Sequence, residues 1–122
     1  MTINRFEDIN AWQAARELVK QVYRAINDNG NFKKDFRLTG QIQGAAVSVM
    51  SNIAEGFSRR GNKEFIQFLF ISKSSAAEVQ SQLYVALDQN YIDQQKFDSI
   101  YSQAEKVSKL NSGFIKYLRS QL

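Results

Sequence analysis

The sequence predicts an all-α fold, an antiparallel up-down four-helix bundle that occupies residues 1–122 as a single domain. In four stretches, apolar residues recur at three- and four-residue spacing, which is the period of a helix with one buried face. No segment shows the sustained alternation of apolar and polar residues that is typical of a half-buried strand. The 122 residues contain no proline, so each helix can run for many turns. Short connections between such long helices favour antiparallel neighbours.

The first two predicted helices cover residues 8–27 and 39–55. Turn residues separate them, and among these Gly30 is expected to take the left-handed conformation that ends a helix. Thr39 is the expected N-cap of the second helix, because its hydroxyl can accept a hydrogen bond from a free backbone N–H. Gly56 is predicted either to close this helix in the left-handed conformation or to let another backbone approach closely.

The third predicted helix follows Asn62, a good cap residue, and continues to about residue 89. The fourth begins at Asp93 and runs to residue 122. Within the third helix, six of the seven residues 65–71 are large and apolar, and they point all around the helix axis. A helix in a bundle normally has one face in water, so this segment predicts a second buried face.

Two kinds of cover would bury that second face. One is self-association, because homo-oligomers commonly use such a surface. The other is a loop or the amino-terminal arm of the same chain, which carries Ile3 and Phe6. The candidate oligomer contacts on the third helix are Phe65, Ile66, Phe68 and Phe70.

Polar side chains lie beside the apolar stripes of the second and third helices. A hydrogen-bonded network between the two helices would fix their register, since buried polar groups are tolerated only when they are paired. The alternative is that Glu55 and Glu78 form a carboxylate pair for a metal ion or for acid–base chemistry. The residues concerned are Ser48, Asn52 and Glu55 on the second helix and Ser74, Ser75 and Glu78 on the third.

The composition disfavours most classes of enzyme. The chain has no cysteine and no histidine, which excludes disulfides, thiolate metal sites, imidazole ligands and a Ser-His-Asp triad. Two glutamates without histidine also fall short of the ligand set of a di-iron bundle. No spacing joins Tyr23 and Lys73 to these carboxylates in a mechanism. A non-enzymatic protein without a cofactor or metal is therefore expected.

The formal net charge is +4, which is compatible with an RNA or phosphate partner. The cations gather in two segments at opposite ends of the second predicted helix, so each would form a separate small patch. An oligomer would repeat either patch and multiply its field; the alternative is ordinary loop charge in water. The candidate nucleic-acid-binding residues are Lys33, Lys34 and Arg37 in one segment and Arg59, Arg60 and Lys63 in the other.

The chain is expected to be a soluble cytoplasmic protein with no membrane partner. Its first eight residues lack the apolar region of a signal peptide. The longest unbroken apolar run, residues 68–71, is far shorter than the ~20 residues that a membrane helix needs.

Residues 41–56, which end in Asn52-Ile53-Ala54-Glu55-Gly56, resemble the signature of the four-helix-bundle proteins encoded in 23S rRNA intervening sequences. Similarity to this family continues from Phe6 through Trp12, in Glu64-Phe65 and in Tyr91-Ile92, and so covers nearly the whole chain. The resemblance implies a closed four-helix bundle, a ring-like homo-oligomer with a pentamer as the expected form, and a suspected association with ribosomal RNA or another nucleic acid. It implies no catalytic activity.

The sequence departs from the family pattern at three positions. Relatives often have two arginines where this chain has Gln43 and Gly44, and often have proline where it has Met50. The loss of two arginines removes possible phosphate contacts. A glycine inside a helix costs ~1 kcal/mol relative to alanine, so Gly44 is expected to serve close helix packing or an oligomer contact.

These observations lead to two hypotheses for the function. The first is a non-enzymatic oligomeric protein that binds RNA through its basic loops, tolerant of sequence and sensitive to salt. The second is an oligomeric protein–protein interaction or scaffold module with no nucleic-acid role. No motif for reading bases is present in the sequence.

Overall fold

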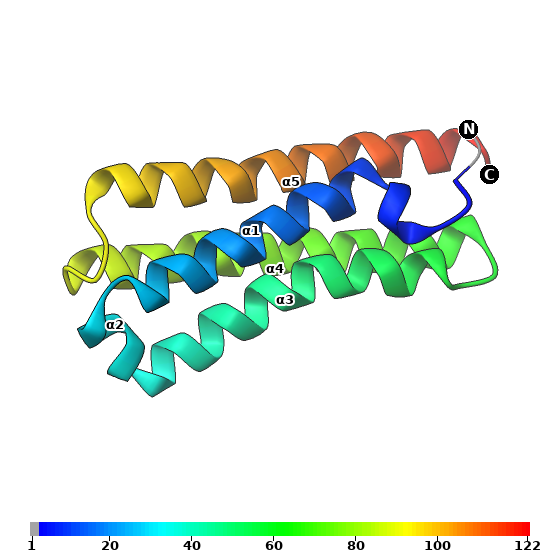
Figure 1. Cartoon of the computed structure of the whole chain (residues 1–122). Helices are drawn as coiled ribbons and strands as arrows, with labels where there is room; N and C mark the ends of the chain where they lie inside the picture. Colours follow the sequence, from blue (N-terminus) through cyan, green and yellow to red (C-terminus); the bar gives the residue numbers. More distant parts are fainter. Residues whose placement is uncertain (1–2) are drawn as a thin grey trace.

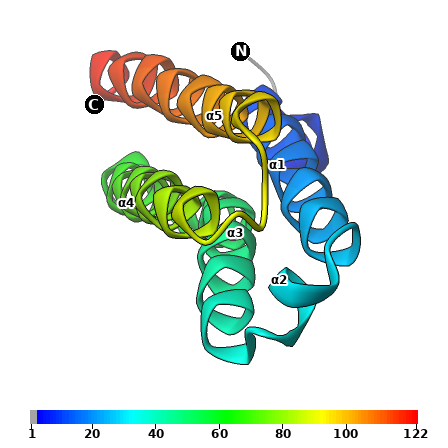
Figure 2. The same ribbon diagram turned by 90° about the vertical axis from the view of Figure 1, so that its left-hand side faces the viewer.

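Four long helices lie side by side and reverse direction at each connection in the computed structural model, which describes residues 3–122 (Figure 1). Helix α3 packs against α4 and α4 packs against α5, while α1 contacts both α3 and α5 and so closes the bundle. Viewed from one end, α1 and α4 lie on opposite sides of the bundle (Figure 2). Strands are absent from residues 3–122. The elements are η1 Phe6–Asp8, α1 Asn10–Asn27, α2 Gly30–Lys34, α3 Phe36–Phe57, α4 Asn62–Asp88 and α5 Gln94–Ser120.

The core follows the apolar periodicity of the four long helices. Removing this apolar surface from water supplies about 25 cal/mol per Å² and is the main force that holds the helices together. Helix α1 contributes mostly alanines, which let its neighbours approach closely, and the other helices contribute larger side chains. The largest fully buried apolar side chains are Leu18, Val22, Phe32, Ile42, Val49, Ile53, Leu69, Val79, Leu83, Ile100 and Val107.

The connection between the first two long helices differs from the prediction. Gly30 is not left-handed; it is the first residue of the one-turn helix α2, which Asn29 caps by accepting a hydrogen bond from the Phe32 N–H at 2.9 Å. The turn forms because Phe32 is buried and stacks on Tyr91, with ring centroids 5.2 Å apart. Tertiary packing thus folds a segment that is too short to show a helical period of its own.

The caps of the later helices differ from the two predicted ones, Thr39 and Asn62. Asp35 caps α3 through its Oδ1, which accepts a hydrogen bond from the Leu38 N–H at 3.1 Å, so Thr39 lies inside the helix. Gly61, which has no side chain to make a capping hydrogen bond, is the N-cap of α4, so the prediction of Asn62 as the cap was wrong and Asn62 is the first helical residue. Asp93, the predicted start of the fourth helix, is the N-cap of α5, and its Oδ1 accepts from the Lys96 N–H at 2.7 Å.

Gly56 lies inside α3 rather than in a left-handed turn after it. An ideal Cβ at this position would lie 2.7 Å from Phe65 Cδ1 and 2.8 Å from Phe68 Cβ. The second predicted role, close approach by another element, is therefore the one that the structure supports. Two α4 side chains occupy the space that a Cβ would need.

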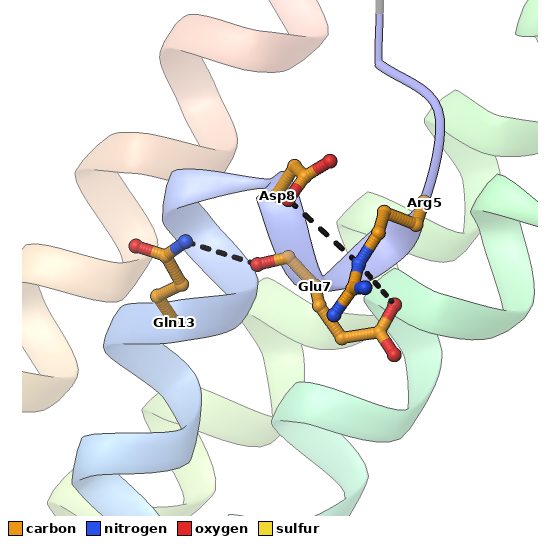
Figure 3. A network of polar contacts seen from close by, with 4 residues as sticks. All are labelled: Arg5, Glu7, Asp8 and Gln13. Atoms are coloured by element: carbon orange, nitrogen blue, oxygen red, sulfur yellow. Dashed lines mark hydrogen bonds and ion pairs between the residues drawn. The ribbon is translucent and has the colours of Figure 1, made fainter.

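Residues 5–8 are tied to α1, and Phe70 and Ile71 on α4 remain exposed. Figure 3 shows Gln13 Nε2 donating to the Glu7 carbonyl at 2.9 Å and the Arg5 guanidinium lying 3.6 Å from Glu7 and 3.8 Å from Asp8. The Phe6 ring packs on Trp12, with centroids 5.2 Å apart.

The apolar segment of α4 is buried on one side only within a single chain. Phe65, Ile66 and Leu69 are in the core, whereas Phe70 and Ile71 are 41% and 46% exposed. The prediction of burial on every side therefore does not hold within one protomer. None of the helices in residues 3–122 combines the length and the apolar character that a membrane crossing requires.

Candidate nucleic-acid interface

The loop between α3 and α4 holds the first of the two predicted basic clusters. Arg59 is fixed in place: its Nη2 lies 2.7 Å from Glu55 Oε1, and its guanidinium carbon lies 4.8 Å from the centroid of the Phe68 ring. Arg60 and Lys63 are exposed, and the structure of residues 3–122 gives them no ion pair. The cluster therefore combines one oriented, partly neutralised cation with two that are available to an external anion.

A pocket of about 450 Å³ adjoins this loop, at the end of the bundle where α5 finishes. The Phe65 ring is part of its lining and packs edge-on against Phe114 and Phe57, with ring centroids 5.1 Å and 6.2 Å apart. Among residues 3–122, no carboxylate side chain lines it. The pocket is formed by Ile3, Phe57, Arg59, Arg60, Gly61, Asn62, Phe65, Phe114, Tyr117, Leu118 and Gln121.

The second basic cluster lies at the other end of α3, as the antiparallel arrangement requires (Figure 1). Lys33 and Lys34 end α2, and Arg37 is in the first turn of α3; all three are exposed. The two clusters are therefore separate patches within one protomer.

A polar contact holds α2 and α3 to the turn before α5. The Tyr91 hydroxyl donates to Asp35 Oδ2 at 2.8 Å. This hydrogen bond, together with smaller effects of desolvation and of the negative charge of Asp35, raises the pKa of Tyr91 above its ordinary value of 10.0. The basic cluster at this end thus sits beside a bond that alkaline pH can break.

The interhelical polar residues form a smaller network than the sequence suggests. Ser48 Oγ and Ser75 Oγ are 2.9 Å apart, and Asn52 Nδ2 donates to the Ser48 carbonyl at 2.8 Å and to its Oγ at 2.9 Å. Glu55 and Glu78 are outside this network: Glu55 pairs with Arg59, and Glu78 is exposed. The described part of the chain has no group of three or more acidic residues that could hold a metal ion.

A second buried network joins three helices and was not predicted. Ser72 Oγ donates to the Val49 carbonyl at 2.7 Å, and Asn111 Nδ2 donates to Ser72 Oγ at 2.9 Å. Asn111 is fully buried, and its Oδ1 has no hydrogen-bond partner. The available signal was an asparagine four residues from both Val107 and Ile115, on the apolar stripe of α5.

The five candidate oligomer contacts do not share one surface of the protomer. Phe65 and Ile66 belong to the core, and Phe68 is half-buried under Arg59. Gly44 is exposed on α3, and an added Cβ would have nothing within 4 Å. The predicted close packing of helices at Gly44 therefore does not occur within one protomer. Gly44 and Phe70 are the two members that a partner could reach directly.

Comparison with known proteins gives a family for this bundle. The sequence model of the 23S rRNA-intervening sequence protein family matches residues 7–113. The chain belongs to this family.

A solved structure shares the fold. It is the 1.70 Å crystal structure of a protein with unknown function from the S23 ribosomal protein family of Bacteroides thetaiotaomicron, which is 24% identical in sequence with a TM-score of 0.77. The similarity covers 87% of this chain and 98% of the other. No curated protein matches the chain.

Proposed function

We propose that this member of the family is a non-enzymatic RNA-binding protein that grips phosphates through its basic loops and acts as a homo-oligomer. The observation that carries the proposal is the α3–α4 loop, where Arg59 and Arg60 line a pocket without carboxylates and Lys63 is exposed nearby. An RNA partner of this kind implies a cytoplasmic protein. Family membership points to ribosomal RNA as the class of RNA to test first.

The chemistry of the loop suits backbone recognition rather than base reading. Arg60 and Lys63 would replace the counterions around phosphates, so affinity would fall steeply as salt rises. Arg59 is already oriented by Glu55 and the Phe68 ring and would lose little side-chain entropy on binding. Such contacts fix position on the RNA and carry no sequence information.

Assembly into a ring, with a pentamer as the expected form, would repeat this loop around one rim. Exposed apolar side chains support self-association: Ile71 lies on α4 and Val47 on α3, and Gly44 leaves room for a neighbour to come close. Repetition of a weak phosphate site raises the overall affinity through effective concentration.

The test is light scattering coupled to gel filtration at low and high salt, with protein and nucleic-acid absorbance recorded together. Wild-type protein should elute as an assembly near five subunits that sheds RNA as salt rises. The triple variant R59E/R60E/K63E should lose RNA retention and keep its mass, and K33E/K34E/R37E reports on the second cluster. A matched control, R16E/K20E/R24E, makes the same change of net charge on the exposed face of α1.

Retention of RNA by both loop variants would overturn the loop mechanism. Equal loss in the α1 control would mean that net charge, rather than the loop, controls binding. The second candidate function is a protein interaction module, favoured by the 81% exposed Phe36 and by Ile71. An assembly that carries no RNA at any salt concentration would support this candidate instead.

A further inference from the structure

A second groove lies between α4 and α5, and it shares no lining residue with the pocket at the α3–α4 loop or with the two predicted clusters. It has a volume of about 350 Å³ and an open mouth, and both of its walls are helices, so its side chains are held on rigid elements. Its lining residues are Phe70 and Lys73 on α4 and Ser112, Ile115, Lys116 and Arg119 on α5.

The groove is strongly basic, and none of its charge is neutralised by the described part of the chain. Lys73, Lys116 and Arg119 line it, no acidic side chain does, and none of the three forms a salt bridge within residues 3–122. Residues 106–122 include four Lys or Arg and no Asp or Glu. By contrast, Arg59 in the α3–α4 loop already has a carboxylate partner at 2.7 Å.

The groove also contains an aromatic ring that lies outside the hydrophobic core. Phe70 is 41% exposed although its neighbour Leu69 is fully buried. Lys73 Nζ and the Arg119 guanidinium carbon lie 5.8 Å and 5.4 Å from the centroid of the Phe70 ring. Both cations lie over the ring, so a base that stacks on Phe70 takes the place of a cation there, and the displaced cation is then within reach of the adjoining phosphates.

We propose that the α4–α5 groove binds single-stranded RNA, with an unpaired base against Phe70 and the flanking phosphates on Lys73, Lys116 and Arg119. The inference rests on the proposed RNA-binding function and adds the type of RNA segment that is recognised. A duplex keeps its bases stacked inside, so it could use the cations of the groove but not the ring. Recognition of a loop, a bulge or a free end follows from this difference.

Charge and ring together favour RNA over the other possible occupants. An acidic peptide would satisfy the three cations but would make no particular use of an aromatic face. A second copy of this chain would have to bring carboxylates to a groove with three unpaired cations, and it would make no distinction between a flat ring and an aliphatic side chain at position 70.

The experiment measures binding of the full-length protein to an oligouridylate and to an RNA duplex of the same length, over a series of salt concentrations. F70L keeps an apolar side chain and removes the ring; we expect about 10- to 100-fold weaker binding of the single strand and little change for the duplex. F70W keeps an aromatic ring and should bind the single strand about as tightly as wild type, and the oligouridylate should quench the fluorescence of the added indole. Y84L is the matched control, because Tyr84 is also an exposed aromatic residue on α4 but lies outside the groove.

The charge variant K73Q/K116Q/R119Q should reduce the salt slope for the single strand by about 2, the value for three lost phosphate contacts. If F70L binds the single strand as wild type does, or if F70L and Y84L lose affinity equally, the groove proposal is wrong while RNA binding by the loop can still stand. If F70L alters the assembly mass and leaves RNA affinity unchanged, the groove is a protein contact. If the wild type binds neither RNA, both proposals fail together.

Discussion

The two ends of helix α3 are held in different ways. At the α3–α4 end, Gly56 lets Phe65 and Phe68 fill the space beside the helix, and Phe65 packs on two further rings. At the α2 end, the contacts are directional and polar: Asp35 caps α3 and accepts the Tyr91 hydroxyl, and Phe32 stacks on the same tyrosine. Close apolar packing holds the α3–α4 end, whereas the hydrogen bond from Tyr91 to Asp35 and the stacking of Phe32 on Tyr91 hold the α2 end.

This difference matters because each end carries a basic cluster. Apolar close packing is insensitive to pH and is disturbed by added volume. A hydrogen bond between a phenol and a carboxylate disappears when the phenol ionises. The two clusters should therefore respond to different perturbations, although both are short runs of exposed cations.

The largest effect on stability should come from adding a side chain at Gly56, at the closely packed α3–α4 end. In Gly56→Ala, the new Cβ would meet Phe68 Cβ, which cannot move without α4. We expect the free energy of unfolding to fall by about 2–3 kcal/mol, measured by urea denaturation. The matched control, Gly44→Ala, has open space around the new methyl group and should raise it by up to ~1 kcal/mol through helix propensity.

If Gly56→Ala changes the free energy of unfolding no more than Gly44→Ala does, α4 can move to make room for the methyl group. Close packing at Gly56 would then not be what holds this end of α3. If Gly44→Ala instead reduces the mass of the assembly, Gly44 is an oligomer contact. Light scattering on both variants separates these outcomes from a simple change in stability.

Between the two ends, the buried hydrogen bonds of Ser72 and Asn111 should show an intermediate effect. Ser72→Ala leaves the Asn111 amide, whose Oδ1 is already unpaired, without a partner for its Nδ2 as well. The expected loss is about 1–2 kcal/mol of unfolding free energy. Asn111→Leu keeps the branched shape and removes the buried amide, and Ser72 keeps its bond to the Val49 carbonyl.

We therefore expect Asn111→Leu to lie within about 1 kcal/mol of wild type in the same urea experiment. Equal, large losses for both variants would indicate that the network stabilises the bundle as a unit. Directional hydrogen bonds, rather than apolar packing alone, would then stabilise the middle of the bundle, as the Asp35–Tyr91 bond does at the α2 end.

The four long helices were predictable because each has an apolar stripe several turns long. Helix α2 was not, since its single turn depends on Phe32 meeting Tyr91, which lies far away in the sequence. The Thr39 cap was wrong for a related reason: Asp35 starts the helix earlier, and a local pattern cannot rank two possible caps.

The sites show the same limit. The basic clusters can be found by inspection of the sequence, but the ion pair of Arg59 with Glu55 and the place of Phe70 between Lys73 and Arg119 depend on side-chain directions across helices. The link from Ser72 to Asn111 joins residues on two different helices. The periodicity of one helix does not predict which of its polar residues will face a polar residue on another helix.

The smallest effect, and the one that tests the polar end most directly, is its response to alkali. The pKa of Tyr91 is raised in the folded protein because the neutral phenol donates to Asp35. The stabilisation from this bond is thus fully present below the unfolded value of about 10 and is lost as pH rises through the higher folded value. In Tyr91→Phe, the ring remains available to stack on Phe32, but this pH dependence should disappear.

Two measurements check the alkaline prediction. A tyrosinate absorbance titration of the wild type should contain a late-ionising component that is missing in Tyr91→Phe. Tyr23→Phe, which removes an exposed tyrosine on α1, is the control and should retain this component. Thermal unfolding at a series of pH values above 10 should bring wild type and Tyr91→Phe closer together, because the wild type loses the bond that the variant never had. If their difference stays constant over this range, the Asp35–Tyr91 bond does not stabilise the α2 end, and Phe32 stacking alone must hold the Lys33–Lys34 cluster in place.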